Sequence, residues 1–208
     1  MLIHYLIRVP ICIIWAFIHR SIYGIYKMYD PSLTWDFVSL LDVDFNLHAN
    51  NSIYNQYFER ARWAHAILSK NLSLMTKDGY NPLVMGSVLR YRRSLPLFAI
   101  IRVKSQIIGF DDKFEYWSQK IYHKNRVAAA VVFRVAFVKG GKVIPSSVIA
   151  RKGLEITYGK EWADKYPDSK IVPTDNFRDV VEELPEIQEL ISAFSEADKQ
   201  AWEILGDE

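Results

Sequence analysis

Polar and apolar side chains alternate through residues 42–50, Asn51 follows, and the polar residues are of types that can carry out hydrolysis. The stretch reads Asp-Val-Asp-Phe-Asn-Leu-His-Ala-Asn-Asn. A carboxylate can attack a carbonyl or deprotonate water, an amide can bind a developing oxyanion, and an imidazole can move protons. Together these groups could transfer an acyl group to water.

A strongly amphipathic segment follows this stretch and predicts a helix of about five turns. Its apolar positions recur at the spacing of one helix face: Tyr54, Tyr57, Phe58, Ala61, Ala64, His65 and Leu68. Asn50, Asn51 and Ser52 have side chains that accept hydrogen bonds from the free amides of a first helical turn, so the helix should begin near them. The helix dipole would then favour negative charge at the polar loop.

The rest of the chain predicts strands that surround this helix. We expect a short strand over residues 34–41 and, after the breakers at 78–82, four strands separated by turn residues, over 83–91, 99–110, 113–123 and 126–138. The strand over 126–138 is apolar on both faces at 127–133 and should lie centrally. Gly140-Gly141 predicts a hairpin into a further strand over 142–149. The fold class is therefore α+β, with an antiparallel sheet wrapped around a long central helix.

The motif D-x-D-x-N-x-H-x-N-N-x-x-Y-x-x-Y-F-E-x-A-R of residues 42–62 resembles the start of the central helix in hotdog-fold acyl thioesterases of the 4-hydroxybenzoyl-CoA type. The resemblance extends over about residues 34–150 and includes Arg90-x-Arg92-Arg93-Ser94-Leu95 and the segment 108–116. With the hydrophobic N-terminus, it is nearest to animal members of that superfamily. It implies the hotdog fold, hydrolysis of a fatty acyl thioester on coenzyme A or an acyl carrier protein, no cofactor or metal, and a homodimer with sites across its interface.

The resemblance also implies roles for three residues. Asp44 matches the carboxylate that serves as nucleophile or general base, and the alternative is that it only caps the loop. Asn46 and His48 extend this to an aspartate, asparagine and histidine arrangement similar to that of plant acyl-carrier thioesterases. Many relatives have apolar residues where Asn46 stands, and His48 could instead fix the loop through its ring nitrogens.

A second group of residues is expected to bind substrate. Asn50 and Asn51 match paired asparagines that position the backbone and cap the helix, and Tyr54 and Tyr57 are either core or acyl-tunnel lining. Arg90 and Arg92, with Arg93, could bind the phosphates of coenzyme A, but a basic strand edge that prevents aggregation explains them equally well. Glu59 matches a position from which some hotdog enzymes take their acid, although a helix-surface partner for Arg60 or Arg62 is the favoured reading.

The first 29 residues form a separate unit in this prediction, a membrane anchor or amphipathic helix. Residues 9–18 are an uninterrupted apolar run, which is too short to span a bilayer alone. On a helical wheel, His4, Arg8, His19, Tyr23 and Lys27 share one side, which suits a tilted or in-plane membrane helix with its basic side toward the headgroups. A secretory signal and a helix packed on the globular domain are the alternatives. The expected location is a membrane, in a eukaryote the endoplasmic reticulum, or else outside the cell.

Composition limits the remaining possibilities. A chain of 208 residues that is 50% hydrophobic can bury one core, here assigned to residues 30–153, with residues 154–208 as an extension with a helix over 188–205. A net charge of +2 argues against a nucleic-acid partner, and the single Cys12 lies in an apolar run and predicts a buried thiol. Serine-hydrolase, nucleotide-binding and zinc-protease motifs are absent from the sequence.

Two other functions remain compatible with the sequence. A hotdog protein without catalysis could bind acyl groups or partners in membrane lipid homeostasis. An enoyl-acyl hydratase uses a similar cluster, but its D-x-N-P-x-H spacing differs from that of Asp44 and His48 and includes a proline.

Overall fold

The computed structural model describes residues 2–161, 189, 192–193, 196–197 and 200. Its helices are α1 (Leu2–Tyr23), α2 (Asn51–Leu68), α3 (Leu72–Thr76) and α4 (Ser146–Tyr158). Its strands are β1 (Ser32–Phe37), β2 (Asn81–Tyr91), β3 (Ile100–Phe110), β4 (Phe114–His123), β5 (Arg126–Lys139) and β6 (Lys142–Ile144). The helix predicted over 188–205 falls outside the continuous part of the chain that the structure describes.

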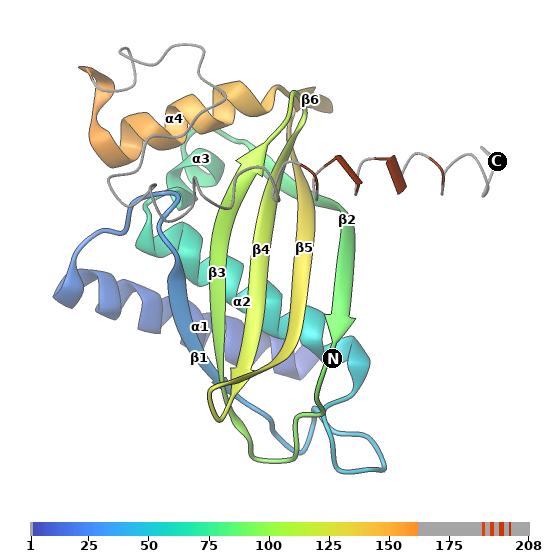
Figure 1. Cartoon of the computed structure of the whole chain (residues 1–208). Helices are drawn as coiled ribbons and strands as arrows, with labels where there is room; N and C mark the ends of the chain where they lie inside the picture. Colours follow the sequence, from blue (N-terminus) through green and yellow to red (C-terminus); the bar gives the residue numbers. More distant parts are fainter. Residues whose placement is uncertain (1, 162–188, 190–191, 194–195, 198–199, 201–208) are drawn as a thin grey trace.

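An antiparallel sheet in the order β1-β3-β4-β5-β2 curls over α2, and β6 pairs with the end of β5 (Figure 1). The α+β hotdog architecture is thus confirmed. Strand β5 lies between β4 and β2, as expected from its apolar sequence. Alternate β3 residues, among them Ile101, Val103 and Ile107, are buried in the core, because successive side chains of a strand point to opposite faces.

Helix α2 begins where the sequence predicts, and its 18 residues make the predicted five turns. Asn50 is its N-cap, and its side-chain oxygen accepts a hydrogen bond from the Ser52 amide. The apolar face of α2 is buried against the sheet, with Phe58 packed edge-to-face on Phe133 of β5. His65 is also buried, and its ring nitrogens contact the Ser32 hydroxyl and the Met28 carbonyl. Burial lowers the pKa of His65 to about 4, so the ring is neutral and has a structural role.

The prediction of a strand over residues 142–149 is wrong beyond residue 144. β6 ends at Ile144, Pro145 is the N-cap of α4, and the chain continues as a helix to Tyr158. Proline fixes its own φ in a range suited to a helix start, which a pattern of alternating apolar residues does not show. The predicted domain boundary after residue 153 therefore falls inside α4. Gly153 contacts Met28, and a Cβ at this position would overlap the Met28 sulfur.

Helix α1 packs on α2 through Ala16, which is fully buried against Ala64, Ile67 and Leu68. Two of its side chains bond to carbonyls of α2: Arg20 donates to the Ile67 carbonyl and the Cys12 thiol to the Arg60 carbonyl. Of the side predicted to face headgroups, Arg8 instead faces the protein, where its guanidinium lies 2.9 Å from the Asp42 carboxylate, whereas Tyr23 is exposed. Burial raises the pKa of Cys12 to about 11, which keeps the thiol protonated.

The opposite face of α1 is apolar and exposed. It is formed by Leu6, Ile7, Ile11, Ile14, Ile18 and Ile22. By length and composition, the window Leu6–Tyr23 could cross a membrane. The same helix is therefore both docked on the domain and apolar toward its surroundings.

Candidate functional site

The polar loop that precedes α2 is a small hairpin. Val43 and Ala49 form an isolated β-bridge, and the Asp44 amide donates to the His48 carbonyl at 3.0 Å. Leu47, with a φ of 57°, closes the turn, and its amide donates to the Asp44 carbonyl. The hairpin brings Asp44 and His48 opposite each other, directly before the start of α2.

The segment after β2 holds this hairpin in place. The Ala49 amide donates to the Leu95 carbonyl at 2.8 Å, and the Leu97 amide donates to the Leu47 carbonyl at 2.9 Å. His48 and Pro96 form a second isolated bridge. The loop is therefore paired on both sides, which restricts the positions available to its side chains.

Asp44 and Asn46 lie at the turn of the hairpin. The Asp44 carboxylate is half-buried and accepts a hydrogen bond from the Asn46 amide at 2.9 Å, while the Asn46 side chain is exposed. His48 is half-buried. The bond to Asn46 gives Asp44 a part in the turn, as the capping alternative requires, and leaves its carboxylate accessible to a ligand. Beside it, Phe45 is fully exposed.

The loop also contains a second carboxylate, Asp42, for which the sequence alone predicts no role. Asp42 is fully buried and accepts hydrogen bonds from the Ser39 amide (2.8 Å), the Ser39 hydroxyl (3.1 Å) and the Tyr57 hydroxyl (3.0 Å). The Arg8 guanidinium of α1 lies 2.9 Å from the same oxygen. Asp42 thus connects the loop to both α2 and α1.

A second ion pair supports the first. Arg60 of α2 binds Asp36 of β1 through Nε at 2.7 Å and Nη2 at 2.6 Å, and Arg8 lies 3.7 Å from Asp36. Arg60 was expected to lie off the buried face of α2, but it is buried. A helical wheel cannot show this, because the partner Asp36 is far away in the sequence.

The predicted substrate-binding residues separate into groups. Asn50 caps the helix, as the resemblance implies, and Asn51 is exposed in its first turn, where its carbonyl accepts a hydrogen bond from the Tyr91 hydroxyl. Tyr54 and Tyr57 are buried in the core, and Tyr57 binds Asp42. This favours the core alternative for both tyrosines.

Arg90 and Arg92 flank Tyr91 at the end of β2, and both are exposed. Tyr91 points to α2, so Arg90 points to the opposite face of the sheet. Arg92 lies just beyond the strand, and its amide donates to the Ala128 carbonyl. The structure thus places the two arginines at the same end of the sheet as the polar loop, and Arg90 on its outer face.

A cavity of about 160 Å³ lies between the second half of α2 and the sheet. Its lining is mostly apolar and includes Trp63, Ala66, Leu74, Val84, Val135 and Phe137. Glu59, Arg62 and Glu115 are its charged members. Glu59 therefore lines a cavity and is not simply a surface partner of its helix neighbours. Tyr54 and Tyr57 do not line this cavity.

Glu115 is buried at this cavity, where the Trp117 indole donates a hydrogen bond to its carboxyl at 2.8 Å. Burial raises the pKa of Glu115 from 4.5 to about 7, and the bond from Trp117 opposes this shift. The folded protein therefore binds a proton here that the unfolded chain has lost between these two pH values.

The Glu115→Gln variant tests this burial. Because the pKa is raised in the folded state, the wild type loses stability as pH rises from 4.5 through 7. The neutral variant lacks this loss, so its free energy of unfolding relative to wild type should increase by about 2 kcal/mol between pH 5 and pH 8.5. Urea denaturation at both values measures it. An equal difference between the two proteins at both values would contradict a raised pKa.

Comparison with known proteins places this geometry in a family. The family model described as "Thioesterase-like superfamily" matches residues 38–175 of this chain. Protein THEM6 of Xenopus laevis is 33% identical over 135 residues, which cover 62% of this chain and 64% of that protein. Protein THEM6 of Drosophila melanogaster is 30% identical and covers 57% and 60%, respectively. The match thus spans less than two thirds of each of these relatives.

Solved structures agree with this assignment. The probable thioesterase YbaW from Escherichia coli is 25% identical, with a TM-score of 0.56, and the match covers 60% of this chain and 97% of YbaW. A probable thioesterase from Bartonella henselae is 17% identical, with a TM-score of 0.52, covering 56% and 98%; it shows the fold alone. The chain belongs to the thioesterase-like superfamily, as a hotdog protein similar to THEM6.

Proposed function

We propose that this protein hydrolyses fatty acyl thioesters at the start of α2, with Asp44 as general base or nucleophile. The observation that carries the proposal is the position of Asp44 in a paired hairpin directly before the α2 N-terminus. Amides of a first helical turn favour a developing oxyanion, and a carboxylate beside it can activate water or attack the carbonyl. Asn46 and His48 of the same hairpin are the candidate oxyanion and proton-transfer groups.

The cavity beneath the sheet is the proposed site for the acyl chain. It begins at Glu59, eight residues after the first residue of α2, or about 12 Å along the helix axis. Its volume of about 160 Å³ is close to that of a dry protein cavity that binds benzene, so it can hold about six carbons of a chain end. If the thioester lies at the N-terminus of α2, a long acyl chain that runs along the helix would reach this cavity. Long-chain thioesters, on coenzyme A or an acyl carrier protein, are therefore the preferred substrates.

The free edge of β2 supports a homodimer. Among the described strands, β2 pairs only with β5, and its exposed residues include Leu83, Val84, Met85 and Val88. An unpaired apolar edge favours pairing with a second strand. A second copy of this chain would extend the sheet there and cover the side of the cavity at Val84.

Membrane association through α1 is the proposed location. Its exposed apolar face would enter the lipid, while Arg8 and Arg20 hold its other face on the domain. A helix lying in the membrane surface keeps these contacts. This arrangement would place the domain beside a membrane, into which long acyl chains partition.

Release of free thiol from acyl-CoAs of short, medium and long chain by the full-length protein tests the proposal. We expect turnover above background, with kcat/KM highest for the long chains. Turnover on no chain length would reject hydrolysis. A non-catalytic acyl-binding protein is the second candidate, because the cavity can bind a chain whether or not Asp44 acts.

The Ala66→Phe variant tests the role of the cavity, since Ala66 lines it. A phenyl ring there would exclude part of the acyl chain, and each methylene left in water costs about 0.8 kcal/mol. Exclusion of two methylenes should lower kcat/KM for long-chain acyl-CoA by about tenfold, with little effect on a short chain. Ala66→Ser is the matched control and should retain the chain-length profile. The same loss on short and long chains would contradict this site.

A further inference from the structure

Three long basic side chains form a row across the outer face of the sheet. Lys104 of β3 is opposite Lys120 of β4, Lys120 is opposite Ala130 of β5, and Ala130 is opposite Arg90 of β2. Their sequence neighbours Val103 and Ile121 are buried in the core, so the row points away from α2. Three strand spacings separate Lys104 from Arg90, or about 14 Å.

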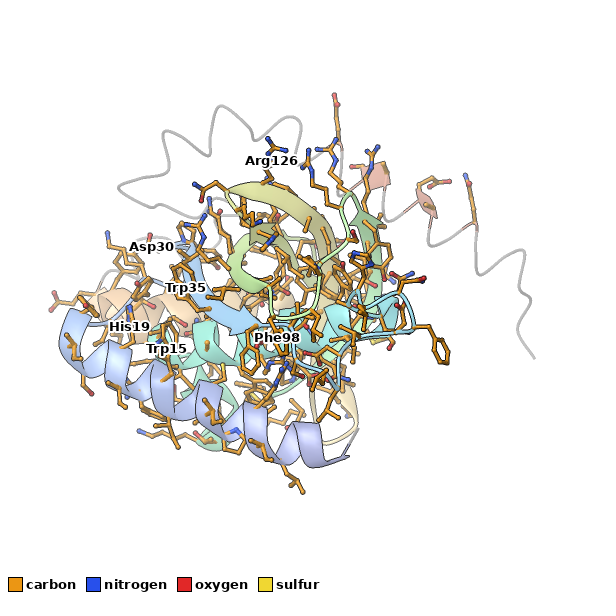
Figure 2. The ribbon with its side chains drawn as sticks, turned by 90° about the horizontal axis from the view of Figure 1, so that it is seen from below. Trp15, His19, Asp30, Trp35, Phe98 and Arg126 are labelled. Atoms are coloured by element: carbon orange, nitrogen blue, oxygen red, sulfur yellow. The ribbon has the colours of Figure 1, made fainter. Side chains whose placement is uncertain are left out.

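Further cations continue this row to the rim of the sheet. Arg92 follows β2, and Lys124 and Arg126 lie at the β4–β5 turn. Figure 2 shows Arg126 at this rim, where other nitrogen-tipped side chains also gather. We call these residues the basic surface, and all six are exposed: Arg90, Arg92, Lys104, Lys120, Lys124 and Arg126.

No acid of strands β1–β5 balances the basic surface. These strands contain two carboxylates, Asp36 and Glu115, of which Asp36 binds Arg60 of α2 and Glu115 lines the cavity. The salt bridges found within the described residues do not involve the basic surface. Residues 1–161 hold 22 of the 26 basic residues of the chain and 11 of its 24 acidic residues. The net charge of the whole chain is therefore small although residues 1–161 are strongly basic.

Stability of the sheet does not explain the row. Like charges directly opposite on neighbouring strands are destabilising, and Lys104 faces Lys120 in this way. Lysines on edge strands prevent sheets from aggregating, but β3 and β4 are interior strands. An anionic ligand would be attracted to both ammonium groups and would offset the repulsion between these lysines.

We propose that the basic surface binds an acidic protein that carries the acyl thioester. This inference rests on the proposed function and names the carrier. The cations spread over about 14 Å and do not converge on one point, as donors around a single phosphate group do. A protein surface with many carboxylates matches such a spread and would be drawn to it electrostatically.

The place of the basic surface agrees with delivery of a substrate. Arg90 and Arg92 flank Tyr91, whose hydroxyl donates to the Asn51 carbonyl at the first turn of α2. The segment just after Arg92 pairs with the hairpin that holds Asp44. A carrier bound at the rim would therefore lie at the same end of the sheet as the candidate site.

A membrane is a poorer match for this surface. The exposed apolar residues of α1 lie on the helix side of the sheet, whereas Arg126 lies on the opposite side of the molecule (Figure 2). A bilayer in contact with α1 would leave the basic surface in water. The two faces can therefore bind lipid and a soluble partner at the same time.

Titration of the full-length protein with an acyl carrier protein that bears a fatty alkyl chain through a thioether, in place of the acyl thioester, tests the proposal. We expect saturable binding that weakens with salt, and at least a tenfold higher Kd for the double variant Lys104→Glu/Lys120→Glu. The matched control is Lys139→Glu/Lys142→Glu, which reverses another exposed lysine pair, in the β5–β6 hairpin. The control should keep the wild-type Kd, and both variants should keep their affinity for a thioether analogue of acyl-CoA.

Several outcomes would overturn the proposal. Absence of carrier binding with intact acyl-CoA binding would reject the carrier and leave the proposed function standing. Equal losses in both double variants would show nonspecific attraction. Tighter binding of phosphatidylserine vesicles, or of a peptide of residues 179–208, with the same dependence on Lys104 and Lys120 would assign the surface to lipid or to the acidic segment of this chain. Carrier binding that needs these lysines, without turnover, would support the surface and reject hydrolysis.

Discussion

The Asp44→Asn variant should lose thioester hydrolysis almost completely while it remains folded. A general base or nucleophile contributes about 10²–10⁴-fold to rate, and an amide can neither take a proton from water nor attack the carbonyl. The side-chain oxygen of asparagine can still accept the hydrogen bond from the Asn46 amide, so the turn should persist. We therefore expect kcat for acyl-CoA to fall at least about 100-fold, as measured by thiol release.

Thermal unfolding and substrate affinity serve as controls for this variant. Asp44 is half-buried at the turn of the hairpin, so Tm should stay within about 2 °C of wild type. An Asn46→Ala variant should lose less kcat than Asp44→Asn, because it removes one donor to the oxyanion but leaves the base in place. Retention of more than half of the wild-type kcat by Asp44→Asn would show that Asp44 only caps the loop.

The Arg8→Leu variant should destabilise the protein by about 3 kcal/mol and reduce activity. It leaves the Asp42 carboxylate buried without the guanidinium that lies 2.9 Å from it, and breaking one partner of a buried pair typically costs 3–5 kcal/mol. It also removes the contact of Arg8 with the Phe37 ring, 4.6 Å from the ring centroid. The Asn50 amide donates to the Asp42 carbonyl, so the loss should reach the start of α2. Urea denaturation and thiol release measure the two effects.

A double-mutant cycle separates the charge from packing. Asp42→Asn removes the buried charge but retains an oxygen that can accept from the Ser39 amide and the Tyr57 hydroxyl. In Arg8→Leu/Asp42→Asn the total loss should be smaller than the sum of the single losses by about 2 kcal/mol. Additive losses would mean that Arg8 acts on stability only through α1 packing.

The N-terminal segment contributes to the core and to the polar loop. The sequence predicts a separate unit over residues 1–29, yet Met28 and Tyr29 are buried in the core and Arg8 pairs with a carboxylate of the loop. Removal of this segment would remove part of the domain. Activity should therefore be measured on the full-length chain in a mild detergent.

Local sequence patterns predict the elements whose stability comes from their own periodicity. The spacing of Tyr54, Phe58 and Ala61 predicts α2, and Asn50 predicts its start, because a capping side chain acts within two residues. The alternation of polar and apolar residues in β3 predicts which face of the sheet is exposed to solvent and which is buried. Pro145 marks the point where the prediction fails, since a short apolar run fits a strand or a buried helix equally well.

The parts of the site that depend on distant residues could not be predicted from local patterns. Arg60 is charged and is expected at the helix surface, but Asp36 of β1 neutralises it in the fold. Glu115 stands between Phe114 and Tyr116, where alternation alone would place a charged residue on the exposed face, and only the structure shows that it lines a cavity with Trp63 and Phe137. The row of Lys104, Lys120 and Arg90 depends on the register of four strands, which the sequence does not specify.

The catalytic role of Asp44 can be tested by comparing wild type and Asp44→Asn in two assays on the same full-length preparations. One assay follows thiol release from a long-chain acyl-CoA, and the other measures the Kd of its thioether analogue. We predict equal affinities, with turnover by the wild type alone. Tight binding by both proteins with turnover by neither would reject hydrolysis and identify an acyl-binding hotdog protein without catalysis.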